Sequence, residues 1–335
     1  MSYASRNESY LLGSTGSIIQ GLACGWGAYS HTLSGSVDLW WNPVHLMFYS
    51  GIAIVIAAVC RGLRDQSRPP TLSPVHFVNL AGLKLAVVGL TIQIIAGIWN
   101  EITHHFIRYE SSVTLANVLL VIGMLTINLG MLVGLSIEYG MMKRDILVVD
   151  DWKVVLTFIF LVLGFASVWL TTIGSIIFTA QMSHSVASRW ALAMLMSISA
   201  TVVLVPAKKV LPNPGSAGLI SGIFNAFGFV TLVVYLRHTP YVPIGILSAL
   251  GFDLLLVDIG GKFKRNHATF IASAIFGSLF YVTYYPYTIN LFAWTIYPFV
   301  MASLILGSVI GAIIGVKIYS AFSFAVLGDT LEYVR

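Results

Sequence analysis

Long apolar runs recur from one end of the chain to the other, and they constrain the fold more than any other feature. Hydrophobic residues make up 57% of the 335 residues and charged residues only 9%, whereas about a quarter of a soluble domain is charged. The runs match the ~20 residues that an α-helix needs to cross a bilayer. The sequence therefore predicts an all-α fold, a polytopic integral membrane helical bundle of about ten transmembrane helices.

Ten segments fit this description, of which the first and the eighth are short or interrupted by polar residues. They span 12–32, 44–62, 77–104, 112–139, 153–180, 187–205, 216–236, 241–257, 268–286 and 290–320. The polar start, MSYASRNESY, lacks the basic-then-apolar layout of a cleaved signal, so we expect the first span to be retained. In the last span, Gly307, Gly311 and Gly315 repeat at four-residue spacing, which favours close packing against another helix.

The basic residues predict the orientation, because cytoplasmic loops of membrane proteins carry an excess of lysine and arginine. Most of the 18 basic residues fall in the even-numbered loops and at the two ends of the chain. Both termini are therefore predicted to be cytoplasmic, in a multi-pass protein of the cell membrane. The net charge of +5 is spread over short loops, so we expect membrane lipid and no nucleic acid as partners.

A weak internal repeat occupies the first half. Trp26 and His31 recur at the end of the third span as Trp99 and His104, and Gly51 corresponds to Gly123 when one residue is dropped. Residues 12–62 and 77–139 are thus predicted to be twin helical hairpins of the same orientation, related by an axis along the membrane normal. The sequence divides into 1–150, the twin-hairpin half with an outer histidine cluster, and 151–335, a second membrane half for helix packing and partner contacts.

The turn of the first hairpin concentrates polar and aromatic side chains at its predicted outer end. The stretch WGAYSHTLSGSVDLWWNPVHLMFYSG contains His31, Asp38 and His45 between two apolar runs. Tryptophans favour the membrane interface, and Pro43 suits the first turn of a helix, where its missing N–H costs nothing. The two imidazoles and the carboxylate are candidate ligands at the outer face.

The turn of the second hairpin contains Glu101, His104 and His105, whose i, i+3 and i, i+4 spacing places them on one helix face. A carboxylate and imidazoles that converge suit a divalent metal ion. We therefore predict one outer-face site. The candidate metal ligands are His31, His45, His105, Glu101 and Asp38, and the candidate cofactor-binding histidines are His31, His45, His104 and His105.

This pattern resembles the C subunit of the particulate methane and ammonia monooxygenases. That family has an acid, a histidine four residues later and a second histidine some thirteen residues further, at the outer ends of successive helices. His31 and WNPVHLMFY with His45 match the two histidines, with one extra residue between them, whereas Gly27 replaces the acid. EITHH, from Glu101, keeps the acid and histidine, whereas Asn117 or Val118 replaces the later histidine. The resemblance implies a copper-type site and membership of a multi-subunit oxidative or respiratory complex, in which the chain is catalytic or supportive.

Three alternative functions remain open at this point. Two imidazoles from different helices would suit a cytochrome b-like subunit that binds one haem b near the outer face. A transporter is less favoured, because no pair of spans has matching Gly or Pro interruptions. A non-catalytic membrane anchor would make the histidines incidental. Asp253 is the one acid well inside a predicted span, where it serves either proton transfer or a buried hydrogen bond.

Overall fold

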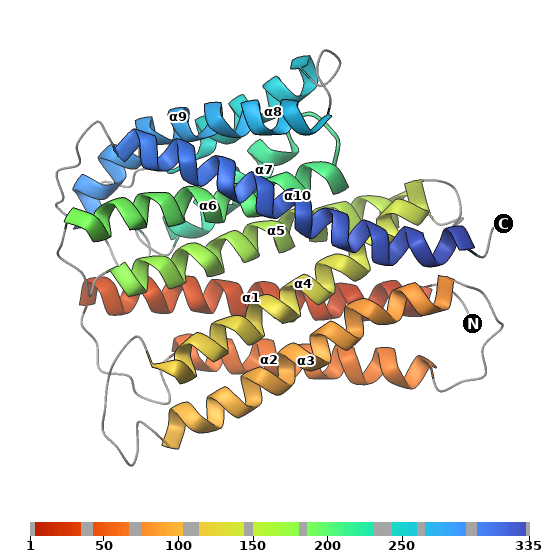
Figure 1. Cartoon of the computed structure of the whole chain (residues 1–335). Coiled ribbons are helices and arrows are strands. Elements are labelled where there is room, and N and C mark those ends of the chain that lie inside the picture. The colour runs from red at the N-terminus through yellow and green to blue at the C-terminus, as the bar shows by residue number, and fades with distance from the viewer. Residues whose placement is uncertain are drawn as a thin grey trace. The chain divides into compact units, whose positions relative to one another are not determined.

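The computed structural model describes residues 4–34, 43–66, 75–102, 114–143, 150–180, 186–230, 233, 243–259, 265–292 and 300–332 (Figure 1). This part of the chain forms ten α-helices. They are α1 (Ala4–Ser34), α2 (Pro43–Gln66), α3 (Val75–Ile102), α4 (Leu115–Lys143), α5 (Asp151–Ala180), α6 (Val186–Val210), α7 (Ser216–Phe229), α8 (Ile246–Ile259), α9 (Arg265–Phe292) and α10 (Val300–Glu332).

Seven of these helices, α2–α6, α9 and α10, are long and apolar enough to cross a membrane. The all-α, multi-pass membrane fold that the apolar runs predict is thus confirmed. The other three helices differ in kind. The first, α1, has 31 residues but is rich in serine and glycine, whereas α7 and α8 have 14 residues each. A helix of that length extends about 20 Å, less than the ~30 Å hydrocarbon core.

The chain divides into two compact units. The first comprises Met1–Cys24, Val37–Thr171 and Ala321–Arg335, and the second comprises Gly25–Ser36 and Thr172–Ser320. Helices α2–α4 therefore belong to the first unit together with most of α1 and α5, and α6–α9 belong to the second together with most of α10. The sequence-based division at residue 150 stays a prediction.

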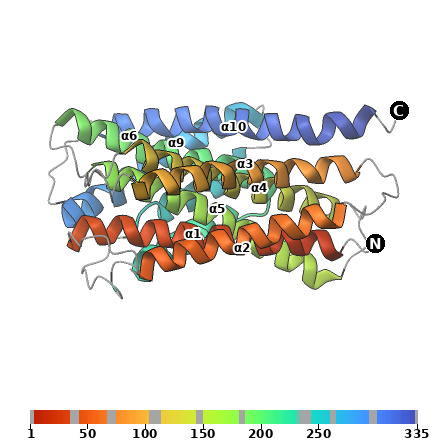
Figure 2. The ribbon, with the colours of Figure 1, turned by 90° about the horizontal axis from the view of Figure 1, so that it is seen from below.

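In the first unit, α1 lies beside α2 and α3 lies beside α4 (Figures 1 and 2). A Cβ atom at Gly16 of α1 would lie 2.6 Å from the carbonyl oxygen of Gly51 on α2. A Cβ atom at Gly89 of α3 would lie 2.7 Å from the carbonyl oxygen of Gly123 on α4. Both hairpins therefore have a close backbone approach at a glycine pair, and the two pairs occupy corresponding positions of the repeat.

Contacts between the hairpins also occur at corresponding positions. The ring of Tyr10 on α1 packs against Gly134 of α4, and the side chain of Leu83 on α3 packs against Gly62 of α2. In the repeat, Leu83 corresponds to Tyr10, and Gly134 corresponds to Gly62. The two hairpins therefore exchange equivalent contacts, α1 with α4 and α3 with α2.

In the second unit, α10 packs closely on α6. Gly307 contacts Ser197 and Met194, and Gly311 contacts Thr201 and Ile198. A Cβ atom at either glycine would lie 2.5 or 2.6 Å from a backbone carbonyl oxygen of α6, which is closer than a side chain allows. The small-residue ridge predicted for the last span is confirmed as a helix-packing surface.

Aromatic rings join α8 to α9. Phe252 of α8 meets Phe276 of α9 edge to face, with ring centroids 6.3 Å apart. Phe276, Phe280 and Tyr284 then stack along α9, with centroids 5.3 and 6.0 Å apart. All four side chains are fully buried, so they form the core between these two helices.

Candidate functional site

The structure places the predicted ligands at helix ends but describes only one of their side chains. His45 lies in the first turn of α2, half-buried, with its ring 6.3 Å from that of Tyr49 between centroids. The backbone of His31 lies in the last turn of α1, and that of Glu101 in the last turn of α3. Their side chains lie outside the described residues, as do Asp38, His104 and His105 in full.

Convergence of these residues on one centre therefore stays a prediction. Among the side chains that the structure does describe, no three histidine, cysteine, aspartate or glutamate residues are grouped so that they could hold a metal ion. The first unit nevertheless contains a polar centre of a different kind.

Two glutamines meet in the interior of the first unit. Gln20 of α1 and Gln93 of α3 are 0% and 1% exposed, and Gln93 Nε2 donates a 2.8 Å hydrogen bond to Gln20 Oε1. Each glutamine also packs its Cγ against the second glycine of its own hairpin crossing, Gly51 or Gly123. The pair thus occupies equivalent positions of the two hairpins and joins them through one bond.

This bond leaves part of each amide unused. Gln20 Nε2 and Gln93 Oε1 have no hydrogen-bond partner among the described residues, and neither does Asn100 Oδ1. Asn100 lies two turns beyond Gln93 along the same face of α3. Buried polar atoms without a partner each cost about 1–3 kcal/mol. Because Gln20 Nε2 is a donor and Gln93 Oε1 an acceptor, a second bond between the two amides would satisfy both of them.

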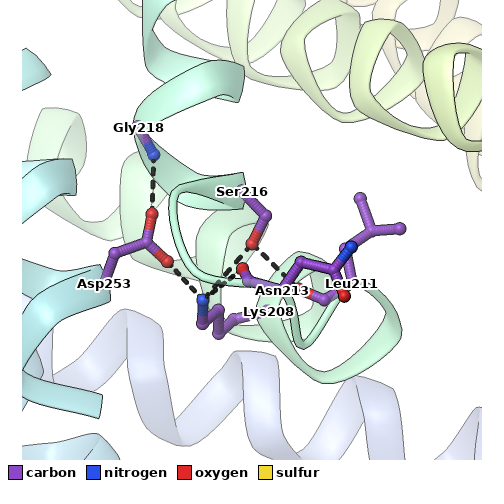
Figure 3. A network of polar contacts seen from close by, with 6 residues as sticks. All are labelled: Lys208, Leu211, Asn213, Ser216, Gly218 and Asp253. Atoms are coloured by element: carbon purple, nitrogen blue, oxygen red, sulfur yellow. Dashed lines mark hydrogen bonds and ion pairs between the residues drawn. The ribbon is translucent and has the colours of Figure 1, made fainter. Parts of the chain in front are cut away.

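The second unit contains a buried ion pair, drawn in Figure 3. Lys208 Nζ in the last turn of α6 lies 2.5 Å from Asp253 Oδ1 on α8, with the two side chains 9% and 3% exposed. Asp253 Oδ2 accepts a 2.9 Å bond from the backbone N–H of Gly218, in the first turn of α7. A carboxylate is favoured there because the first N–H groups of a helix lack partners within the helix and carry partial positive charge.

The Lys208 side chain also has polar partners besides Asp253. Its Nζ donates to the carbonyl oxygen of Asn213 at 2.7 Å and lies 3.5 Å from Ser216 Oγ, which in turn donates to the carbonyl oxygen of Leu211. Every member of this network has partners, so it joins α6, the 211–215 turn, α7 and α8 rather than leaving a group open for a ligand. The network is a structural clamp, and of the two roles considered for Asp253 the structure shows the buried hydrogen bond.

The opposite end of the α7–α8 pair is fixed by an amide. Asn225 of α7 accepts a bond from the N–H of Ile244 and donates one to its carbonyl oxygen, at 2.8 and 2.9 Å. Gly245, with a positive φ of 79°, follows directly, and its N–H donates to Thr283 Oγ1 of α9. Short α7 and α8 are thereby held antiparallel by a polar tie at each end.

Sequence reasoning missed Gln20, Gln93 and Lys208. Gln20 and Gln93 are 73 residues apart, the same separation as Trp26 and Trp99. The repeat was therefore the sequence signal that could have identified the two glutamines. The predicted sixth span ends at residue 205, which places Lys208 in the loop that follows. The structure corrects this, because the helix extends to Val210 and the lysine turns toward α8.

No family model, curated protein or solved structure matches the chain.

Proposed function

We propose that this multi-pass membrane protein carries a copper-type metal site at the outer end of its twin hairpins, and that it serves as a subunit of an oxidative or respiratory membrane complex. The observation that carries the proposal is the Gln20–Gln93 hydrogen bond. It joins the two hairpins at equivalent positions, which is compatible with an internal repeat whose axis passes between α1 and α3.

Helical periodicity connects this bond to the histidines. His31 and His104 each follow one of the glutamines by eleven residues, which is three helical turns or about 16 Å. In a regular helix this spacing would place His31 on the same face as Gln20. One further turn of α3 beyond Ile102 would place His104 on the Gln93 face. We expect the two histidines at equivalent positions of the repeat, at the outer ends of their helices.

The donor set suits the proposed metal. Imidazole is a good ligand for copper, zinc, nickel and iron. His45 in the first turn of α2 adds an imidazole, and His105 lies next to His104. A carboxylate from Glu101 or Asp38 would orient a histidine and raise its basicity. The resemblance of these two motifs to the copper membrane monooxygenases favours copper within this group.

Metal analysis of the purified protein tests the proposal. Wild type is expected to contain copper and to lack a Soret band, whereas His31→Ala and His104→Ala each lose most of the metal because each removes one ligand. His267→Ala is the control, since this exposed histidine lies in the first turn of α9, at the predicted inner face. A Soret band would establish the haem b alternative. Full metal retention in both variants, or no metal in wild type, would contradict a site at these histidines.

We also propose that both termini are cytoplasmic, because the basic residues gather on one side of the predicted spans. Asn213, exposed in the turn between α6 and α7, is on that side. In a chain with Cys24 and Cys60 replaced by serine, Asn213→Cys is expected to resist a membrane-impermeant thiol reagent in intact cells and to react in inverted vesicles. Reaction in intact cells would reverse the topology.

A further inference from the structure

Lys84 is a charged residue on the exposed surface of a helix that is long and apolar enough to cross a membrane. It lies three residues after the start of the apolar span Ala81–Asn100 of α3, and its side chain is exposed. It has no hydrogen bond or ion pair with any residue that the structure describes. A cation in hydrocarbon is costly, so a lysine near the end of a span extends its ammonium group toward the lipid headgroups. Lys84 therefore needs an anion that the described side chains do not supply.

Lys84 lies beside the contact that joins α2 to α3. A Cβ atom at Gly62 of α2 would lie 2.6 Å from Leu83 Cδ1 of α3, so Lys84 is at the depth of the C-terminal end of α2. The two helices run in opposite directions (Figure 1). Because they are antiparallel and right-handed, one step past this contact turns both chains to the same side. Leu63 and Lys84 are therefore neighbours on one flank of the helix pair.

This flank faces away from the interior of the first unit. On the opposite side of the same contact, Arg61 of α2 pairs with Glu8 of α1. There too, Gly82 of α3 packs against Tyr10 of α1. Helix α1 thus covers the side on which the preceding residues lie, whereas the residues that follow the contact are exposed. The exposed flank therefore faces the membrane.

Apolar side chains continue the flank toward the middle of the membrane. Ile56 precedes Leu63 by seven residues on α2, and Ile94 follows Val87 by seven residues on α3, so each pair shares one helix face. The four side chains are 36–48% exposed. Together with Lys84 they define the α2–α3 flank. It combines a cation at headgroup depth with two apolar rows, which matches the charge and hydropathy of an anionic phospholipid.

We propose that the α2–α3 flank binds one anionic phospholipid, with the lipid phosphate at the Lys84 ammonium group and an acyl chain along the two apolar rows. Arg64, exposed at the same end of α2, adds positive potential within a Debye length. A zwitterionic lipid has the same phosphate but also a cationic group, so it binds less tightly. The lipid site does not depend on the proposed metal site, and it is the same for either orientation of the chain.

Lipid binding to the purified full chain tests this proposal. Phosphatidylglycerol and phosphatidylcholine with identical acyl chains are titrated into the protein in detergent, and bound lipid is counted by native mass spectrometry. Wild type is expected to bind one phosphatidylglycerol about fivefold more tightly, since a basic residue near the surface contributes ~1 kcal/mol toward an anionic lipid. The preference should disappear in Lys84→Gln and persist in Lys84→Arg. Equal affinity for the two lipids in wild type would overturn the proposal.

Lys317→Gln is the matched control. Lys317 of α10 is also exposed, and it lies three residues before the end of the span Val300–Ser320, as far inside its span as Lys84. A general attraction of lysines for anionic lipid would lower binding equally in the two glutamine variants. We expect Lys317→Gln to keep the wild-type preference, and an equal loss in both variants would contradict a site at the α2–α3 flank.

A phosphatidylglycerol that carries a diazirine in its acyl chain locates the lipid in liposomes. It is expected to crosslink to the segments of α2 and α3 that contain Ile56 and Ile94. The yield should fall in Lys84→Gln and stay unchanged in Lys317→Gln. If Lys84 instead pairs with an acidic helix of another protein, the yield would not depend on Lys84, and the lipid assignment would be wrong.

Discussion

Replacing Asp253 by alanine is expected to destabilise the protein by about 3–5 kcal/mol, the usual cost of removing one partner of a buried ion pair. The variant leaves Lys208 with its charge almost completely buried. It also removes the acceptor of the Gly218 N–H at the start of α7. The loss is measured as a lower unfolding midpoint in detergent, by thermal and by denaturant titration.

Two comparisons show whether the ion pair is the cause. In Lys208→Met/Asp253→Leu both charges are replaced by apolar groups of similar size, and the double variant is expected to be more stable than Asp253→Ala. Asp150→Ala removes an ion pair in which Lys153 Nζ and Asp150 Oδ2 are 3.8 Å apart and the aspartate side chain is largely exposed to solvent. This substitution should therefore destabilise the protein by less than ~1 kcal/mol. If Asp253→Ala costs no more than Asp150→Ala, the network does not clamp the helices.

Substituting valine for Gly16 or for Gly89 is the second change with a large expected effect. Each new side chain would meet a backbone carbonyl oxygen of the facing helix, at Gly51 or at Gly123, within 2.7 Å of its Cβ. Because backbone cannot move aside as a flexible side chain can, the helices must separate. We expect losses of about 1–3 kcal/mol or more, and of similar size at the two positions.

Equal losses of stability in the two variants would show that the α1–α2 and α3–α4 crossings are equivalent. The unfolding midpoints of Gly16→Val and Gly89→Val are compared with that of Gly140→Val, where a Cβ atom meets open space among the described residues and little change is expected. A large loss at Gly16 with none at Gly89 would mean that the corresponding spacings do not reflect equivalent packing.

The sequence predicted the helices well, because the length of an apolar run can be read from neighbouring residues alone. The predicted helix ends were less accurate. The first helix begins at Ala4 rather than near residue 12. Its polar first turns continue the helix beyond the apolar run, and Glu8 there pairs with Arg61 of α2. The eighth helix begins at Ile246 rather than near 241, because Gly245 takes a positive φ just before it. Polar helix extensions and glycine turns leave little trace in hydropathy.

Partners in the interior were harder to predict than helices. Lys208 and Asp253 come from α6 and α8, with all of α7 between them in the chain, and Gln20 and Gln93 come from α1 and α3. The packing of the helices decides which polar residues contact one another. The sequence indicates such contacts only where an internal repeat relates the residues. The outer histidines illustrate the reverse case, since their motif is clear in the sequence and most of their side chains lie outside the described residues.

The single bond between Gln20 and Gln93 has a direction, whereas a two-fold rotation has none. One amide must donate and the other accept, so identical residues at matched positions acquire different chemistry. The α1 glutamine retains an unused N–H group, and the α3 glutamine retains an unused carbonyl oxygen. Symmetry is thus broken at this one contact between the hairpins, although the two residues that form it are identical.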